Sequence, residues 1–296
     1  MQANTKAHLA VLTTNFLFGI NYAAMKYITP SHIHPFGLNM ARVSTALVLF
    51  WSLYLFGPAK NMGIQKKHIP RFIICAVTGV VINQLMFVKG LSLTTSIHAS
   101  LLSLGTPIFI TFIAAWVLKE RLSIPKISGL VLGVSGAAVL ILMKDNSHTG
   151  SNLLWGDIMI LLNAISYAFY MVLVRPLMQT YSPIHIIRWI FTFGFVIMLP
   201  FALPTFLQTP WQTFETSHWI VLALICIGAT FVAYLFNIYG ISVIGASATG
   251  SYIYTQPVFA AIVAIVLMGE HLNLYKIISA VLIFSGVYLV NWKRNK

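Results

Sequence analysis

The segments PIFITFIAAWVLKERL (residues 107–122) and PVFAAIVAIVLMGEHL (residues 257–272) decide the fold, because they are two copies of one pattern. Each copy has a proline at its start and a glutamate 13 residues later, and the copies lie 257 − 107 = 150 residues apart. Chance matching of apolar residues would not also align glycine, serine and lysine at one offset. The further pairs at this offset are Gly90 with Gly240, Ser92 with Ser242, Phe109 with Phe259, Ala114 with Ala264, Leu122 with Leu272, Lys126 with Lys276, Ser135 with Ser285 and Gly136 with Gly286.

Apolar segments long enough to cross a bilayer follow one another along both copies. In lipid, every backbone polar group must be hydrogen-bonded within its own segment, which predicts helices rather than strands. The polar link 144–152 separates two units, residues 1–145 and residues 153–296, so the expected fold class is all-α, a polytopic membrane protein of two five-helix repeats. The ten predicted transmembrane helices are 7–28, 35–56, 72–89, 96–118, 127–143, 156–174, 183–203, 219–239, 246–268 and 274–292.

Five crossings is an odd number, so the second repeat starts on the opposite side of the membrane and runs inverted. With the amino terminus in the cytoplasm, 13 basic residues fall at the inner face and 4 at the outer face, as the positive-inside rule requires. The connection 57–71 has four basic residues, whereas its counterpart 204–218 has none. The charges therefore predict that both termini are cytoplasmic.

The composition excludes an ordinary soluble protein, because 58% of the 296 residues are hydrophobic and only 8% are charged. The net charge of +13 lies in short connections, so we expect contact with membrane lipids and not with nucleic acid. Cys75 and Cys226 lie in apolar segments without metal-ligand spacing, and no metal or cofactor is predicted. The glycines Gly129, Gly133 and Gly136 favour helix packing within one chain over a dimer seam, which predicts a monomer or a weak homo-oligomer.

The ten helices, the inverted repeats and the motif that closes each fourth helix resemble the drug/metabolite transporter superfamily, and within it the EamA-like family. The motif is Pro107 with Lys119-Glu120-Arg121-Leu122 in the first copy and Pro257 with Gly269-Glu270-His271-Leu272 in the second. Lys119 stands where the family often has glycine. The resemblance covers nearly the whole chain and implies a permease or exporter, not an enzyme, in the plasma membrane (the bacterial inner membrane), commonly for amino acids or related metabolites.

Uncharged polar side chains occur toward the centres of the predicted spans, where each must face another helix or a cavity. Aromatic residues lie near them, and this mixture suits a small amphipathic substrate such as a zwitterionic amino acid, with interhelical packing as the alternative for each residue. The predicted substrate-binding residues are Asn15, Asn21, Tyr22, Asn83, Gln84, Phe87, His98, Tyr167, Tyr170, Tyr234, Asn237, Tyr252 and Gln256.

Three residues within the spans are structural or gating candidates. Arg42 lies about seven residues inside the second span, where it either snorkels to the outer interface or serves as a fixed cation for a substrate carboxylate. Pro107 and Pro257 bend their helices, and either help to shape the cavity or serve packing only.

Acidic residues are scarce, and two of them complete the gating candidates. Glu120 and Glu270 each precede a residue that can cap the following helix, Ser123 or Asn273, so we expect them to anchor helix ends on opposite membrane faces. No Asp or Glu lies near the centre of a span, so a carboxylate proton relay has no candidate. Among the histidines we expect only His98 to face a cavity, with hydrogen-bonded packing as the alternative.

The leading interpretation is a secondary transporter that binds a small metabolite between the repeats and alternates its exposure by rocking. No P-loop is present, so ATP hydrolysis is not expected. Proton exchange and facilitated diffusion both remain open, and the shortage of buried acids favours the latter. The alternatives are a membrane enzyme that acts on lipid-linked substrates, an exporter of drugs or cationic compounds, and a sensor that transports nothing.

Overall fold

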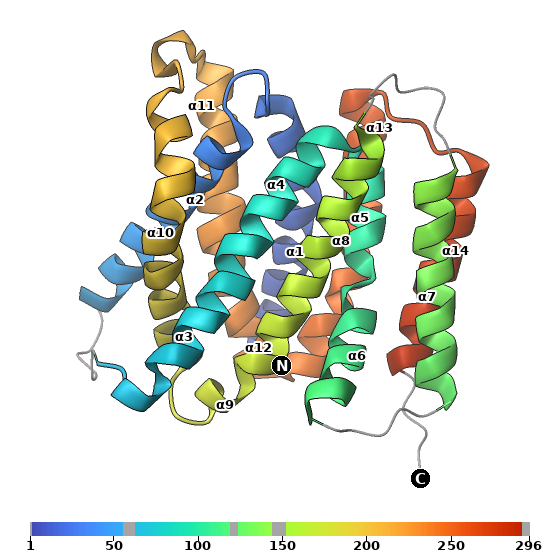
Figure 1. Ribbon diagram of the computed structural model, residues 1–296, viewed down its shortest axis with the longest axis horizontal. Coiled ribbons are helices and arrows are strands. Elements are labelled where there is room, and N and C mark those ends of the chain that lie inside the picture. Colours follow the sequence, from blue (N-terminus) through green and yellow to red (C-terminus); the bar gives the residue numbers. More distant parts are fainter. Residues whose placement is uncertain (1, 56–62, 119–123, 144–151, 292–296) are drawn as a thin grey trace.

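The computed structural model describes residues 2–55, 63–118, 124–143 and 152–291. Every regular element in these ranges is helical, and the helices stand side by side in one bundle (Figure 1). In chain order they are α1 (Gln2–Ile28), α2 (Pro35–Leu55), η1 (Lys66–His68), α3 (Ile69–Ala76), η2 (Val77–Ile82), α4 (Asn83–Leu93), α5 (Ser96–Leu104), α6 (Thr106–Leu118), α7 (Ile124–Leu142), α8 (Leu153–Leu173), α9 (Arg175–Met178), α10 (Pro183–Leu207), η3 (Trp211–Thr213), α11 (Thr216–Ala223), η4 (Leu224–Val232), α12 (Ala233–Ser251), η5 (Tyr252–Thr255), α13 (Gln256–Met268) and α14 (Leu274–Asn291).

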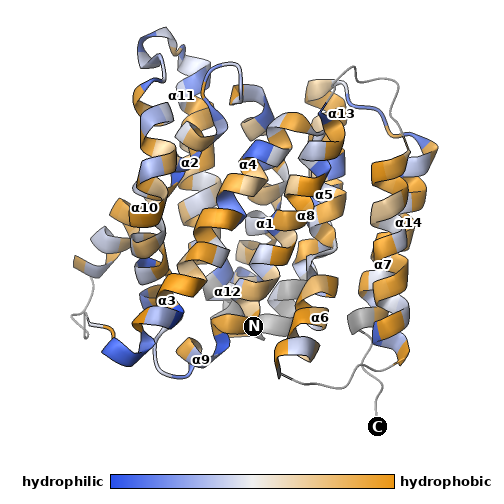
Figure 2. Cartoon of the chain, in the orientation of Figure 1, coloured by the Kyte–Doolittle hydropathy of each residue, from blue (hydrophilic) through white to orange (hydrophobic). Residues whose placement is uncertain are grey.

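The bundle has the dimensions and surface of a membrane protein. Seven helical segments of the described chain are long and apolar enough to cross a bilayer, and two shorter apolar helices, 252–268 and 274–289, accompany them. Hydrophobic residues dominate the length of the helices, and hydrophilic ones are more frequent toward their ends (Figure 2). Large apolar side chains such as Trp116, Val266 and Leu274 are highly exposed, as a surface covered by lipid requires.

Most predicted spans agree with observed helices. α2, α7, α8 and α14 begin and end within three residues of the predicted limits. The third predicted span, 72–89, is part of a longer continuous helical segment from Lys66 to Leu93. The fourth span is divided at Gly105 into α5 and α6, and Pro107 lies in the first turn of α6, where a proline needs no N–H partner.

The eighth and ninth predicted spans differ most from the expectation. We expected separate helices at 219–239 and 246–268, but α12 continues through this region to Ser251. Gly240 and Thr249 nevertheless lie in contact, since a Cβ atom placed on Gly240 would be 3.2 Å from Thr249 Oγ1. Residues nine apart in a straight α-helix are separated by about 13 Å, so α12 bends back between these two residues.

The third and eighth spans both contain a π-helical segment. These segments are η2, Val77–Ile82, and η4, Leu224–Val232. Adding the repeat offset of 150 to residues 77–82 gives 227–232, which falls inside η4. A π turn leaves backbone groups with displaced partners and is common at functional sites. The two segments therefore mark corresponding positions in the two copies.

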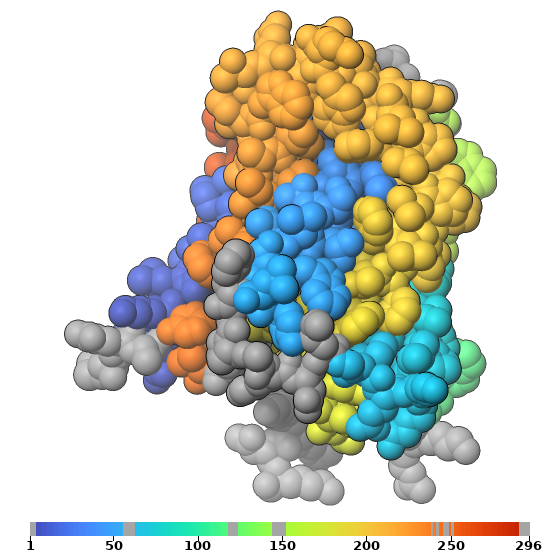
Figure 3. Space-filling model, turned by 90° about the vertical axis from the view of Figure 1, so that its left-hand side faces the viewer, coloured from blue at the N-terminus to red at the C-terminus, as the bar shows by residue number. Residues whose placement is uncertain are grey.

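Helices from the two halves of the sequence pack against each other. α2 packs against α10, and Figure 3 shows the two helices side by side on one face of the molecule. α7 packs against α14, α4 against α8, and α1 against both α12 and α13. Each half of the sequence therefore depends on the other for its core.

Glycines bring α7 and α14 into close contact. A Cβ atom on Gly286 would lie 2.6 Å from the carbonyl oxygen of Gly129 and 2.7 Å from the backbone nitrogen of Gly133. A Cβ atom on Gly136 would collide with side chains of α14, including Ile283. The glycines of the fifth span thus pack within the chain, as expected.

We predict that Gly286→Ala lowers the melting temperature of the purified protein in detergent. The added methyl group meets backbone atoms that have no room to move, and overpacking of this kind costs about 1–3 kcal/mol. Gly228→Ala is the matched control, because a Cβ atom there lies at ordinary contact distance, 3.4 Å, from its nearest neighbour. Equal melting temperatures for the two variants would contradict the close packing of α7 and α14.

Candidate functional site

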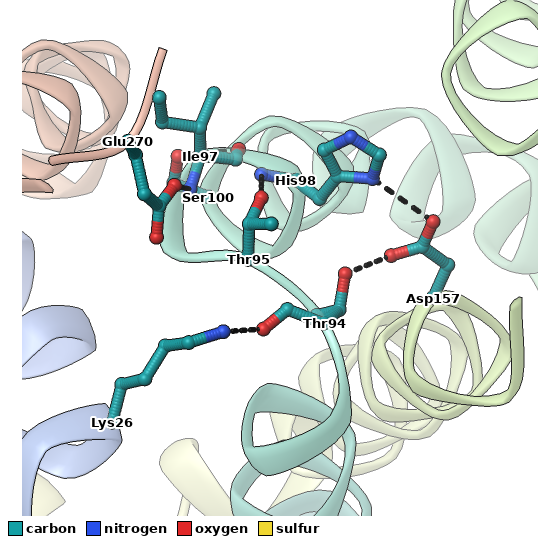
Figure 4. A network of polar contacts seen from close by, with 8 residues as sticks. All are labelled: Lys26, Thr94, Thr95, Ile97, His98, Ser100, Asp157 and Glu270. Carbon is teal, nitrogen blue, oxygen red and sulfur yellow. Dashed lines mark hydrogen bonds and ion pairs between the residues drawn. The ribbon is translucent and has the colours of Figure 1, made fainter. Parts of the chain in front are cut away.

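At one end of the bundle, Glu270 from the second half of the chain holds a helix of the first half (Figure 4). Thr94 and Thr95 have extended backbone conformations and separate α4 from α5. The carboxylate of Glu270 accepts hydrogen bonds from the backbone N–H groups of Ser96, at 2.8 Å, and Ile97, at 3.1 Å. These groups have no partner within α5, and its positive dipole end favours the negative charge. We call this end of the bundle, the upper one in Figure 1, the Glu270 end.

The partner of Glu270 differs from the expectation. The sequence suggested that Glu270 and Asn273 serve the helix that follows, α14, whereas the Glu270 carboxylate caps α5, which starts 174 residues earlier. A carboxylate recognises any free N–H groups that the fold brings to it, and local spacing does not reveal distant ones. Glu120, the counterpart in the first copy, lies outside the described residues.

A second acid, Asp157 near the start of α8, also contacts the break between α4 and α5. Its Oδ1 atom accepts a hydrogen bond from the hydroxyl of Thr94, and its Oδ2 atom lies 3.0 Å from Nδ1 of His98. Lys26 on α1 donates from Nζ to the Thr94 carbonyl oxygen, and Glu270 and Asp157 both attract its charge. His98 is fully buried and faces Asp157, not an open cavity.

This network connects the two halves of the chain at the Glu270 end. Lys26, Thr94 and His98 come from the first half, and Asp157 and Glu270 come from the second. The sequence alone gives no partner for Asp157, which lies near the end of its predicted span. The sequence does indicate that Asp157 has a partner elsewhere in the fold, because an acid inside an apolar helix needs a polar partner from another segment.

Arg42 lies deeper in the bundle, about 10 Å along α2 from Pro35. Its Nη1 atom donates to Oε1 of Gln84 on α4, at 2.7 Å, and its Nε atom donates to the hydroxyl of Thr230 in η4, at 3.1 Å. Asn39, one turn before Arg42, donates to the backbone carbonyl of Gln84 at 2.9 Å. Arg42 is only 5% exposed, so the interpretation that it snorkels to the interface is wrong. We call Asn39, Arg42, Gln84 and Thr230 the Arg42 cluster.

Three tyrosines of the second half lie next to the Arg42 cluster. Tyr234 on α12 lies near Arg42. Tyr167 and Tyr170 on α8 have ring centroids 5.6 Å apart, and both lie near Tyr234. All three rings are half-buried and keep accessible surface. The cluster and the tyrosines together offer charged and neutral N–H donors beside aromatic faces.

The remaining predicted binding residues do not join this cluster, and most pair with other helices. Asn21 donates to the sulfur of Met25, and Asn237 is half-buried. The pairs are Asn15 with Gln256, Asn83 with Asn163, Tyr22 with Phe87, and Tyr252 with His8. Of the predicted substrate-binding residues, Gln84 and Tyr234 therefore lie at Arg42, and Tyr167 and Tyr170 lie near Tyr234.

A surface cleft of about 590 Å³ lies between η5 and α14, away from the Arg42 cluster. Its lining is mainly apolar and consists of Tyr254, Phe284, Ser285, Tyr288 and Leu289. None of the predicted binding residues lines it. Within the described ranges, no group of three or more His, Cys, Asp or Glu side chains is placed to hold a metal ion.

Comparison with known proteins gives a family match over both halves of the chain. The model of the EamA-like transporter family matches residues 5–142 and again residues 154–292. A solved protein structure of 17% sequence identity superposes with a TM-score of 0.63, covering 97% of this chain and 96% of that one, which shows a shared fold.

Relatives of similar length carry transporter names. An uncharacterized transporter of Archaeoglobus fulgidus is 24% identical over 99% of this chain and 100% of its own length. The uncharacterized transporter YoaV of Bacillus subtilis is 26% identical over 96% of both chains. A probable terminal-alkyne amino-acid exporter of Streptantibioticus cattleyicolor is 27% identical over 86% of this chain and 83% of its own.

We predict that Glu270→Gln destabilises the protein by about 1–3 kcal/mol, because the amide offers one oxygen where two buried N–H groups each have a carboxylate oxygen. The measurement is the melting temperature in detergent. Glu215→Gln is the control, since Glu215 is exposed and caps only the neighbouring α11. Equal melting temperatures for the Glu270 and Glu215 variants would show that the cap on α5 stabilises the protein no more than the exposed Glu215 does.

Proposed function

The chain belongs to the EamA-like transporter family, and from this membership we propose that it is a secondary carrier that exports small metabolites, such as amino acids or related amphipathic compounds. The family match covers nearly the whole chain. The observation that carries the substrate class is the Arg42 cluster with its tyrosines, a buried polar and aromatic site built by helices of both halves.

The architecture of the proposal is ten transmembrane helices in two inverted five-helix repeats, residues 1–145 and 153–296. The bend in α12 supports it, because the chain then crosses once before Gly240 and once after Thr249. The helix contacts support it as well. In two equivalent repeats, the third span corresponds to the eighth and the sixth to the first. The contact of α4 with α8 therefore has a counterpart in the contact of α12 with α1. Both contacts are observed.

In the proposed orientation, the protein lies in the plasma membrane with both termini on the cytoplasmic side and the Glu270 end on the outer side. The distribution of basic residues supports it. Alternating access then requires the Glu270 end to open and close. The contacts of Glu270 and Asp157 join the two halves at that end, and in this proposal they break when it opens.

Two of the alternatives weighed from the sequence, the membrane enzyme and the exporter of cationic compounds, have less support than an amino-acid carrier. A membrane enzyme for lipid-linked substrates would be an exception among relatives that are named transporters. An exporter of cationic compounds would have to place a cation beside Arg42, which is electrostatically unfavourable. The relative named as an amino-acid exporter supports an amino-acid substrate instead.

We expect the purified protein in liposomes to release trapped amino acids faster than protein-free liposomes do. Flux should be measured in both directions, with and without an imposed pH gradient, for a panel of amino acids, nucleosides and cationic drugs. A rate that follows the pH gradient indicates proton exchange, and an unchanged rate indicates facilitated diffusion. Failure to move any compound of the panel would refute the carrier, and preferential flux of the cationic drugs would refute the substrate class.

A further inference from the structure

We infer that Arg42 binds the carboxylate group of the transported molecule, and that the site selects amino acids over their uncharged-carboxyl analogues. This inference rests on the carrier function proposed above and specifies its substrate contact. It follows from the charge of Arg42, the neutral groups that hold it and a neighbouring acceptor without a partner.

The first step is that no acid is in place to neutralise Arg42. The chain has five acidic residues. Asp157 is engaged with Thr94 and His98, Glu270 caps α5, and Glu215 caps α11, so all three act at the Glu270 end. The other two acids, Glu120 and Asp145, lie in connections between predicted spans and outside the described residues. Within the described ranges, Arg42 forms no ion pair.

The second step is that neutral groups orient the guanidinium and leave part of it available. Gln84 and Thr230 accept from Nη1 and Nε, which uses two of the five N–H donors of an arginine. The Thr230 hydroxyl donates to the carbonyl oxygen of Ile225 at 2.8 Å, so it can only accept from Arg42. This bond spans five residues and belongs to the π-helical segment η4. The segment η4 therefore presents an accepting hydroxyl to Nε of Arg42.

The third step is an unpaired acceptor on the same face of α2. Asn39 is fully buried, and its Oδ1 atom has no hydrogen-bond partner among the described residues. Asn39 and Arg42 lie three positions apart on one face of α2 and both contact Gln84. A free amino-acid backbone carries a carboxylate and an ammonium group two bonds apart. Arg42 and Asn39 present the complementary donor and acceptor at neighbouring positions.

A buried charge without a counter-charge is costly, and a carboxylate on a guanidinium relieves that cost through short, charge-assisted hydrogen bonds. A carboxamide keeps the size and shape of the ligand but removes its negative charge. Charged hydrogen bonds contribute about 1.5–3 kcal/mol, so the loss of this contact should weaken binding roughly 10- to 100-fold.

The test compares the twenty proteinogenic amino acids with their carboxamides as ligands of the wild-type protein in detergent. Affinity is read from the ligand-dependent rise in melting temperature, because a ligand of the folded state raises it. We expect at least one amino acid to bind and its carboxamide to bind about 10- to 100-fold more weakly. Arg42→Gln should lose this discrimination and bind the acid and the amide equally. Arg42→Lys, which keeps the charge but not the planar pair of donors, should retain part of it.

Arg188→Gln is the matched control for a buried arginine. Arg188 is 2% exposed on α10, stacks on Trp51 and Tyr54, and lies apart from the Arg42 cluster. This variant should discriminate acids from amides as the wild type does. The free Arg42→Gln protein should melt no lower than wild type, because the substitution removes an unneutralised buried charge, and this separates lost binding from lost folding.

Three results would overturn the inference. The first is equal affinity of the wild type for acids and amides, and the second is unchanged discrimination in Arg42→Gln. The third is stabilisation by chloride with no effect of any amino acid, which would assign an inorganic anion to Arg42. The liposome flux panel separates this failure from failure of the carrier: equal flux of amino acids and carboxamides refutes carboxylate recognition alone, whereas no flux of any compound refutes the proposed function.

Discussion

The structure depends on one constraint: a polar group removed from water must find its partner inside the protein. Backbone groups meet the constraint by forming helices in every regular element of the described chain. Where the chain cannot stay helical, at Thr94 and Thr95, a carboxylate from the distant Glu270 supplies the acceptors that the start of α5 lacks. The same constraint makes Arg42 significant, because its partners inside the bundle do not neutralise its charge.

The same constraint also explains how the two halves are joined at the Glu270 end. The groups that complete the first half at the Glu270 end, Asp157 and Glu270, belong to the second half. Polar contacts of this kind are directional and can be broken as a set, unlike the close glycine packing of α7 on α14. Opening of the Glu270 end can therefore break these polar contacts while the close packing of α7 on α14 stays intact, and the Arg42 cluster, which takes residues from both halves, lies below that end.

The sequence was sufficient for the features that depend on local pattern. The repeat at offset 150, the helical class and the limits of α2, α7, α8 and α14 follow from apolar length and from residue identity. It was insufficient where a side chain acts across the fold. The cap by Glu270 crosses 174 residues, and the partners of Arg42 lie on α4 and η4, which no spacing rule brings together. The connection between the eighth and ninth predicted spans also differs from the prediction, because α12 continues as a bent helix where a loop was expected.

The central claim is that the two halves move apart at the Glu270 end during transport. Cysteines at positions 94 and 157, Thr94→Cys with Asp157→Cys, test it most directly in a protein whose Cys75 and Cys226 are replaced by alanine, because the native side chains are hydrogen-bonded to each other. The account predicts that oxidation of the pair stops amino-acid flux in liposomes and that reduction restores it, while the single-cysteine variants are unaffected by oxidation. Full flux through fully cross-linked protein would contradict the account.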